Sequence, residues 1–349
     1  MEPLRVNPGG QLAADQIVGR EREIERFWQV LERQGLVLAA ERRIGKTSIV
    51  TKMRAEPKDG FLPIYQDLEA VHSLPELVRS VYAAADAHFA RVSWLKSRLA
   101  QWSHLLPTKI ANIELPSARE NWKPLLEQAF ADVLESTPTE VKVVFMWDEF
   151  PLMLFNLIQR GGPDSAIQVL DLLRSLRQRH SARLRLLFTG SVGLHLVLKG
   201  LRASGNANNP VNDMCPETVG PLADVDAHSL AERLLLGLRQ PCAERNEIAR
   251  RIVEHVGGFP FFIHKLVDKL AGAGRELRPP LVAACVEDLL FSDLDALDLR
   301  HWPERLELYY SPQDSTLARA ILRAVAHSDD GLRFAELANL VRHESPGVS

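Results

Sequence analysis

An apolar run that leads into a turn with glycine, lysine and threonine constrains this chain more than any other feature. Residues 36–39 read Leu-Val-Leu-Ala, and they are followed by Ala40-Glu41-Arg42-Arg43-Ile44-Gly45-Lys46-Thr47-Ser48. This is the Walker A pattern G-x-x-x-x-G-K-[ST] with alanine in its first position. It predicts a loop between a strand and a helix whose backbone N–H groups, helix dipole and Lys46 face a phosphate chain, while Thr47 binds Mg²⁺.

Two alternatives stay open at this loop. Ala40 is a mild replacement if its φ is negative and a strained one if its φ is positive, because only glycine adopts positive φ freely. A chance turn rich in charge would have similar residues. The strand before the loop and the helix-compatible residues 47–54 after it favour phosphate binding over that chance turn.

A second apolar run ends in two acids. Residues 141–147 read Val-Lys-Val-Val-Phe-Met-Trp, and Asp148 and Glu149 follow, as in a Walker B strand. Such a run is typical of a buried parallel strand, and sheets of this class bind ligands at the carboxyl ends of their strands. We expect Asp148 to bind Mg²⁺ and Glu149 to act as general base on the attacking water. The alternative is a polar strand end that caps the next turn.

A third apolar run has small polar residues after it. Residues 184–188 are followed by Thr189-Gly190-Ser191. If this strand neighbours the acidic one, Ser191 or Thr189 contacts the γ-phosphate or positions the water. The alternative is that these residues only make a turn.

These motifs, in this order, resemble one family, the STAND-type P-loop ATPases of the AAA+-related kind, in the archaeal-type ATPase group. Four segments carry the resemblance: Val18-Gly19-Arg20-Glu21, Arg42-Arg43-Ile44-Gly45-Lys46-Thr47-Ser48, Asp148-Glu149-Phe150-Pro151 and Gly257-Gly258-Phe259-Pro260. It covers about residues 15–290, and Ala40 and Glu41 stand where the family usually has Gly-Pro.

The resemblance implies a cofactor set and a further group of site residues. ATP or ADP and Mg²⁺ would bind between the sheet and a helical lid. Gly19 and Arg20 would lie beside the adenine, residues 40–48 around the phosphates, and Pro260 in the lid near the nucleotide. From the residues alone, Arg20 is also explained as a solvated first-turn residue, and the Gly-Gly-Phe-Pro segment as a helix stop followed by a new start.

Length and charge narrow the class of protein. A chain of 349 residues with a formal net charge of −3 predicts two or three globular domains and argues against a wholly basic nucleic-acid binder. The sequence has no apolar signal core and no run long enough to span a membrane. The three cysteines are far apart, which predicts reduced thiols and a cytoplasmic protein without a transition-metal site.

The predicted fold class is α/β, a parallel-sheet P-loop core of the AAA+-like kind followed by a helical lid and a partial winged-helix-like segment. Strands are expected at about 36–40, 61–67, 141–147 and 184–190, with a polar loop at 202–216 and an inserted helical subdomain at about 74–136 whose three tryptophans are core residues. The predicted divisions are a flexible lead-in at 1–14, the nucleotide domain at 15–215, the lid at 216–312 and the C-terminal segment at 313–349.

Three functions remain open at this point. The first is an ATPase, expected to be slow, that acts as a conformational switch and binds a protein partner or itself in the ATP state. The second is a regulator whose C-terminal segment binds DNA, although Glu336 and Glu344 weaken a DNA-binding face. The third is a nucleotide-binding scaffold without catalysis. An arginine offered to a neighbouring subunit's ATP is a further expectation, and the candidates for it are Arg177, Arg179, Arg202 and Arg300.

Overall fold

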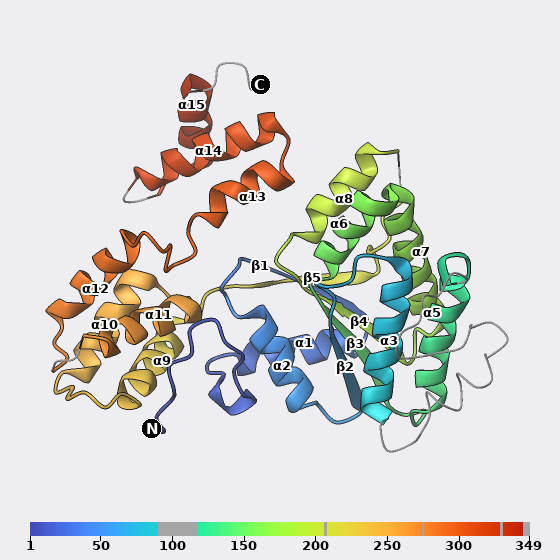
Figure 1. The fold of residues 1–349 in the computed structure, drawn as a ribbon, viewed down its shortest axis with the longest axis horizontal. Helices are drawn as coiled ribbons and strands as arrows, with labels where there is room; N and C mark the ends of the chain where they lie inside the picture. Colours follow the sequence, from blue (N-terminus) through green and yellow to red (C-terminus); the bar gives the residue numbers. More distant parts are fainter. Residues whose placement is uncertain (90–117, 206–207, 274–275, 329–330, 345–349) are drawn as a thin grey trace. The chain divides into compact units, whose positions relative to one another are not determined.

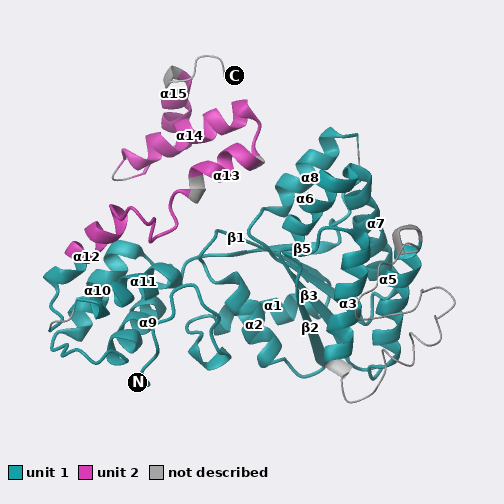
Figure 2. Ribbon diagram, in the orientation of Figure 1, with its two compact units in different colours: residues 1–282 teal, residues 283–349 magenta. Residues whose placement is uncertain are grey.

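The computed structural model describes residues 1–89, 118–205, 208–273, 276–328 and 331–344. The chain divides into two compact units, Met1–Val282 and Ala283–Ser349, which Figure 2 shows in two colours. The first unit contains a sheet and helices. In the described part of the second unit, all regular structure is helical.

A five-stranded parallel sheet forms the centre of the first unit, in the order β2-β3-β4-β1-β5. Parallel strands end at the same edge of a sheet, so the ends of β1, β3 and β4 lie near one another, where ligands of such sheets bind. The strands are β1 (Gly35–Ala40), β2 (Phe61–Asp67), β3 (Lys142–Asp148), β4 (Leu184–Phe188) and β5 (Met214–Val219).

Helices occupy the connections between the strands, as the alternation of patterns predicts. In chain order, the first unit contains η1 (Ala14–Gln16), α1 (Glu21–Leu31), α2 (Lys46–Ala55), α3 (Leu74–Phe89), α5 (Ala118–Glu135), α6 (Phe150–Gly161), α7 (Pro163–Arg179), α8 (Leu194–Ala203), α9 (Asp224–Leu236), α10 (Arg245–Val256) and α11 (Pro260–Ala271). Helix α12 (Pro280–Leu290) crosses the boundary between the units.

Helices cover both faces of the sheet, and β3 shows why its sequence is apolar throughout. Val144 and Met146 belong to the core cluster that α1 and α2 build on one face. Phe145 and Trp147 alternate with them and therefore face the other side, where Phe130 of α5 lies 4.5 and 6.1 Å from their ring centroids. Figure 1 shows α1 and α2 on one side of the strands and α3, α5 and α7 on the other.

The predicted fold class is confirmed: a parallel α/β P-loop core is followed by a helical region. The four predicted strands are present, although β4 ends at Phe188. The prediction missed β5 and was wrong in treating residues 202–216 wholly as a loop, because β5 begins at Met214 and pairs with β1 beyond the boundary expected at residue 215. Pro216 and Glu217 interrupt the apolar pattern by which a strand is recognised in the sequence. Proline is tolerated there because β5 is an edge strand.

The described parts of the insertion predicted at about 74–136 are helical: they form α3 and α5, and residues 90–117 between them lie outside the described residues. Trp122 in α5 is 4% exposed and belongs to the core, as expected. Trp94 and Trp102 lie outside the described residues.

The N-terminal residues contact the helical end of the first unit. Leu4 is buried, and its N–H donates to Arg233 O of α9 at 2.9 Å. The N–H of Asn7 donates to Nδ1 of His264 in α11 at 3.1 Å. These contacts argue against the flexibility predicted for residues 1–14.

The second unit is a small helical body. Besides the end of α12 it contains α13 (His301–Tyr309), α14 (Pro312–Ala326) and α15 (Phe334–Glu344). Ser311 caps α14, because its hydroxyl accepts from the N–H of Asp314 at 3.1 Å. Helices α14 and α15 are the two helices predicted within 313–349. The described residues of that range contain no strand that could form the wing of a winged helix.

None of the helices in the described parts of the chain combines the length and apolarity that crossing a membrane requires.

Candidate phosphate-binding site

The loop between β1 and α2 has the backbone that a phosphate-binding turn needs. Gly45 has a φ of +94°, and a Cβ added there would meet nothing within 4 Å. Arg43 also has a positive φ, +68°, which is strained for a residue with a side chain. Ala40 is not among the described residues of positive φ, so alanine replaces the usual glycine without backbone strain.

Lys46, the first residue of α2, is held inside this loop. It is 8% exposed, and its ammonium donates to the carbonyl oxygens of Ala40 and Glu41, each at 2.8 Å. Ile44 is fully buried beneath the loop, and Ser48 lies in the first turn of α2. The loop backbone therefore holds the positive charge of Lys46 at the amino end of a helix, where the helix dipole also favours an anion.

The end of β3 faces the start of α2. The hydroxyl of Thr47 donates to Oδ2 of Asp148 at 2.7 Å, and the N–H of Glu149 donates to Oδ1 at 3.0 Å. Burial raises the pKa of the Asp148 carboxyl, against the hydrogen bond from Thr47, which lowers it. The Walker A and acidic motifs, which stand 101 residues apart at these two positions, are thus in direct contact.

This oxygen pair fits Mg²⁺. The metal is usually held by one or two protein oxygens together with water and substrate phosphate, and a hydroxyl beside a carboxylate supplies such a set. In the described residues, no group of three or more His, Cys, Asp and Glu side chains could hold a metal ion by itself. A magnesium ion at Thr47 and Asp148 would therefore depend on a phosphate ligand.

Glu149 reaches from the end of β3 to the end of β4. Its φ is +53°, and its carboxylate accepts from the N–H and the hydroxyl of Ser191, at 2.9 and 2.8 Å to Oε2. Gly190 leaves room for this contact, because a Cβ there would lie 2.8 Å from Cδ of Pro151 and 3.2 Å from Cα of Glu149. Strain at a non-glycine residue in such a place is typical of functional sites.

Ser191 makes this contact with Glu149, and Thr189 does not. Thr189 is 1% exposed, and its hydroxyl has no hydrogen-bond partner among the described residues. Its backbone instead joins the two strand ends, with the carbonyl accepting from the N–H of Phe150 at 3.1 Å. Of the two candidates on this strand, Ser191 is the one beside Glu149.

Sequence reasoning missed Tyr65, which lies on β2 next to β3. Burial, and then the charges of Asp148 and Asp67, raise the pKa of the Tyr65 phenol. No sequence signal marks it, because its place near Asp148 depends on the pairing of β2 with β3, which brings their ends to the same edge of the sheet.

The opening segment contacts the loop between β1 and α2 and the helix α9 rather than solvent. Arg20 is 2% exposed, pairs with Glu23 and donates to the carbonyl of Ile44 at 3.0 Å. Gly19 has a φ of +72°, and a Cβ there would lie 2.4 Å from Cβ of Asp226 in α9. Arg20 thus supports the loop from behind, which the first-turn solvation alternative does not explain.

The Gly-Gly-Phe-Pro segment lies against the same loop. Gly258 accepts from the N–H of Leu222 at 2.8 Å and has no room for a side chain, because a Cβ would be 2.1 Å from Leu222 O. Phe259 packs against the core cluster that contains Ile44. Pro260 then begins α11.

Arg177 is not available to a neighbouring subunit, so its candidacy as an arginine finger is wrong. It is 6% exposed, and its guanidinium donates twice to Asp213, at 2.9 and 2.7 Å, and to the carbonyl of Pro210 at 2.7 Å. Arg179 is exposed and pairs with Glu127 at 3.3 Å. Arg202 and Arg300 lie on the surface.

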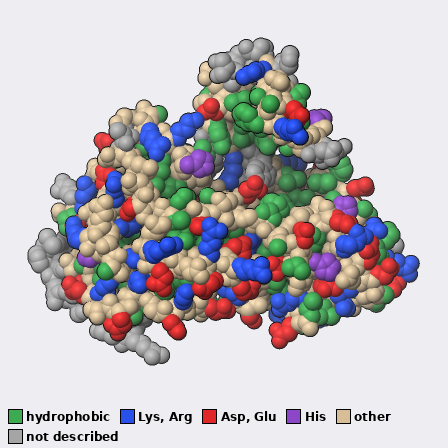
Figure 3. Space-filling model, turned by 180° about the vertical axis from the view of Figure 1, so that it is seen from behind, with side chains coloured by type: hydrophobic (Ala, Val, Ile, Leu, Met, Phe, Trp, Pro, Cys, Tyr) green, Lys and Arg blue, Asp and Glu red, His purple; other side chains and the backbone are tan. Residues whose placement is uncertain are grey.

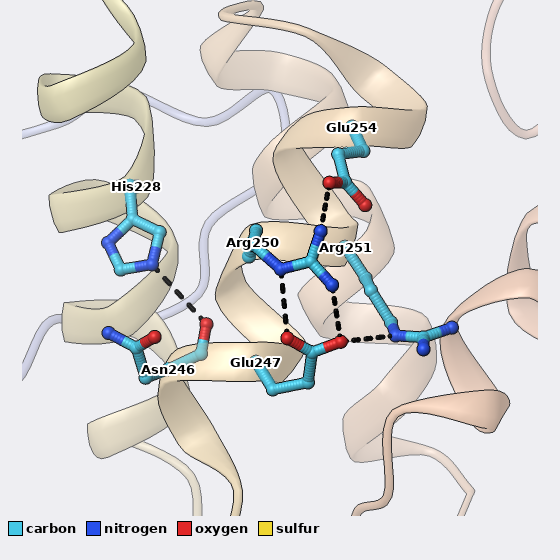
Figure 4. Close-up of polar contacts among 6 residues, drawn as sticks. All are labelled: His228, Asn246, Glu247, Arg250, Arg251 and Glu254. Carbon is cyan, nitrogen blue, oxygen red and sulfur yellow. Dashed lines mark hydrogen bonds and ion pairs between the residues drawn. The ribbon is translucent and has the colours of Figure 1, made fainter.

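A second cluster of charges lies on α10 and is a surface network. Figure 4 shows Glu247 between Arg250 and Arg251, with Glu254 on the far side of Arg250. Hydrogen bonds from Arg250 and Arg251 lower the pKa of Glu247 to about 2. The partners stand three and four residues apart on one exposed helix face, which explains the network as helix stabilisation.

Comparisons with solved structures find distant likenesses. The Aeropyrum pernix ORC2 protein, in a structure described as ADPNP-ADP complexes, is 12% identical over 93% of this chain and 84% of that chain, with a TM-score of 0.49. The Thermotoga maritima RuvB Holliday junction branch migration motor is 12% identical over 97% of this chain and 91% of that chain, with a TM-score of 0.41. No protein-family model and no curated protein matches the chain. The functional assignment therefore rests on the residues of the site.

Proposed function

We propose that this chain binds ATP with Mg²⁺ and hydrolyses it to ADP and phosphate, and that the reaction drives a conformational switch. One observation carries the proposal. The hydroxyl of Thr47 and the carboxylate of Asp148 are 2.7 Å apart, with Lys46 and Glu149 beside them in the chain. A loop for phosphate, a pair of oxygens for Mg²⁺ and a carboxylate for water thus stand at one edge of the sheet.

Each group has a distinct role in the proposed reaction. The N–H groups of residues 40–48 and the ammonium of Lys46 bind the β- and γ-phosphates. Mg²⁺ would neutralise charge on those phosphates, held on the protein side by Thr47 and Asp148. Glu149 accepts a proton from the attacking water, and Ser191 fixes the direction of its carboxylate.

The resemblance to STAND-type ATPases supports a switch over a continuous motor. In that family, the segment around Gly19 and Arg20 and the segment ending at Pro260 lie near the nucleotide. Here both segments contact the phosphate loop or the core beneath it. ATP changes a conformational equilibrium only if it binds one state better than the other, and a lid segment packed on the binding loop supplies such a difference.

The partner would be a protein or a second copy of this chain, bound in the ATP state. All three cysteines are free thiols, which supports a reducing compartment such as the cytoplasm.

The DNA-binding alternative has less support. Residues 283–349 contain six Arg and Lys and twelve Asp and Glu, a formal net charge of −6. Figure 3 shows acidic and basic side chains interspersed over the face in view, without a basic stripe. Phosphate backbones attract positive surfaces, so a unit of this charge is a poor DNA contact. Binding of duplex DNA that weakens steeply with salt and requires residues 314–349 would support this alternative over ours.

The test is phosphate release with ATP and Mg²⁺, with size measured in parallel, for the unmodified protein and Lys46→Ala. We expect slow release that Lys46→Ala abolishes, and an ATP-dependent change in size or compactness that the variant lacks. Tight ATP binding with no phosphate release from the unmodified protein would favour the scaffold alternative. Absence of ATP binding would overturn the proposal.

A further inference from the structure

The side chain of Arg43 is directed at the lid. Its guanidinium carbon lies 4.2 Å from the ring centroid of Phe261, within cation–π distance. Arg43 belongs to the phosphate loop, and Phe261 is the second residue of α11. A residue that the Walker A pattern leaves unspecified thus joins the loop to the helix that follows the Gly-Gly-Phe-Pro segment.

The ring side of the contact is shielded from water, and Arg43 is half-buried. Phe261 is 9% exposed, and Lys265 places a second cation 5.7 Å from the same ring. The backbone of Gly9 lies over the pair: a Cβ added there would be 3.5 Å from Cε2 of Phe261 and 3.9 Å from Nη1 of Arg43. Loss of hydration strengthens a cation–π contact, so this one is worth more than an exposed pair.

Neighbouring residues make a second, parallel contact. Ile44 follows Arg43 in the loop, and Phe259 stands two residues before Phe261. Phe259 packs against the buried cluster that contains Ile44. Arg43 therefore contacts one aromatic side chain of this segment directly, and a second one, Phe259, packs on the core cluster to which the next loop residue belongs.

The backbone of Arg43 is strained, and its contact with Phe261 helps to hold it in that conformation. Its φ of +68° is unfavourable for arginine, and surrounding contacts must hold it there. The carbonyl of Ile44, on the next residue, is held by Arg20. If the lid segment leaves, Arg43 loses its ring partner, and the strained turn relaxes to a shape that presents its N–H groups differently.

We propose that Arg43 is a positioning residue that couples lid docking to nucleotide affinity through its contact with Phe261. The inference rests on the proposed function, and it names the contact that couples phosphate binding at the loop to docking of the lid. By linkage, a lid that stabilises the binding shape of the loop tightens ATP binding, and bound ATP tightens lid docking by the same factor.

A double-mutant cycle tests the coupling. The variants are Arg43→Gly, Phe261→Leu and both together, with Arg43→Lys as the conservative variant and Arg33→Ala as a control for lost surface charge. Glycine tolerates a φ of +68° and other shapes alike, so Arg43→Gly removes the side chain without adding strain, and the lid no longer holds the turn in its binding shape. The readouts are the Kd for ATP with Mg²⁺, and the rate of proteolysis of the lid with and without ATP.

We expect Arg43→Gly and Phe261→Leu each to weaken ATP binding about fivefold to tenfold and to remove the protection of the lid by ATP. The double variant should be no weaker than the worse single variant, Arg43→Lys should recover part of the affinity, and Arg33→Ala should bind like the unmodified protein. If Arg43 acts only as a charge near the phosphates, Phe261→Leu binds ATP normally and the two effects multiply, which overturns the coupling.

The failure of this inference differs from the failure of the proposed function. If the unmodified protein binds ATP and Phe261→Leu binds it equally well, the proposed function stands and the coupling is wrong. If the unmodified protein binds no nucleotide under any condition, both are wrong. Denaturant unfolding of every variant without nucleotide shows whether each still folds, so that a weak Kd is not mistaken for loss of structure.

Discussion

The carboxylate of Glu149 accepts hydrogen bonds from both the backbone N–H and the hydroxyl of Ser191, at 2.9 and 2.8 Å. Glu149 directly follows β3, and Ser191 lies three residues after the end of β4, the neighbour of β3 in the sheet. A carboxylate held by two donors keeps one direction, which a general base needs. The contact therefore makes Ser191 a positioning residue for the proposed base.

Removal of the Ser191 hydroxyl should slow hydrolysis without weakening nucleotide binding. Ser191→Ala leaves one donor on Glu149, and we expect kcat to fall about tenfold with an unchanged Kd for ATP, as for loss of one hydrogen bond to a charged group. Thr189→Val is the matched control, because that hydroxyl has no hydrogen-bond partner in the described structure. Equal rates in Ser191→Ala and the unmodified protein would remove Ser191 from the site.

Replacement of Asp148 by asparagine should stabilise the nucleotide-free protein at neutral pH while removing Mg²⁺-dependent ATP binding. Because burial raises its pKa, the Asp148 carboxyl favours folding when protonated, and that contribution is lost as the pH rises through the folded pKa. Asparagine stays neutral and still accepts from Thr47. Denaturant unfolding should show Asp148→Asn about 1 kcal/mol more stable at pH 7.5 and little different at pH 4.5. A less stable variant at pH 7.5 would contradict this account.

His264 should make the protein less stable as the pH falls from about 6.5 towards 4. Burial lowers its pKa to about 4, so the unfolded chain binds a proton in this window and the folded chain does not. The difference corresponds to roughly 3 kcal/mol lost across the window. Unfolding free energies of His264→Asn, which keeps an acceptor for the N–H of Asn7, should lack this slope. His255→Asn, at an exposed position on α10, should keep it.

Loss of the Arg177–Asp213 pair should destabilise the fold. Burial alone would raise the pKa of Asp213, but the hydrogen bonds and charge of Arg177 outweigh it and the pKa is lowered. Arg177→Ala leaves that carboxylate half-buried without its partner, and we expect a loss of about 3 kcal/mol in denaturant unfolding. Arg179→Ala breaks an exposed pair and should cost less than about 1 kcal/mol. Unchanged stability of Arg177→Ala would reopen its candidacy as an arginine finger.

The sequence predicts the parts of the fold that depend on local pattern. Strand β3 is buried on both faces and therefore appears as an unbroken apolar run, and the loop between β1 and α2 has its own signature. Strand β5 has no such run, because an edge strand paired only with β1 tolerates Pro216 and Glu217. Its pairing is a property of the assembled sheet.

The candidate site also has a part that the sequence predicts and a part that only the folded structure shows. Lys46, Thr47 and Asp148 follow from motif spacing, because strand ends converge at one edge. The contacts of Arg20 with Ile44 and of Arg43 with Phe261 join segments that are remote in sequence. No periodicity encodes them, and only the packed structure shows that they support one loop.

The most direct test of the account is the identity of the nucleotide that the protein retains. The unmodified protein, Lys46→Ala and Glu149→Gln would each be incubated with ATP and Mg²⁺, separated from free nucleotide, and the bound nucleotide identified. We predict ADP on the unmodified protein, ATP on Glu149→Gln and none on Lys46→Ala, because the proposed function has Lys46 bind the phosphates and Glu149 activate the water. Equal amounts of ADP on the unmodified protein and Glu149→Gln, or retention by Lys46→Ala equal to both, would contradict the central claim.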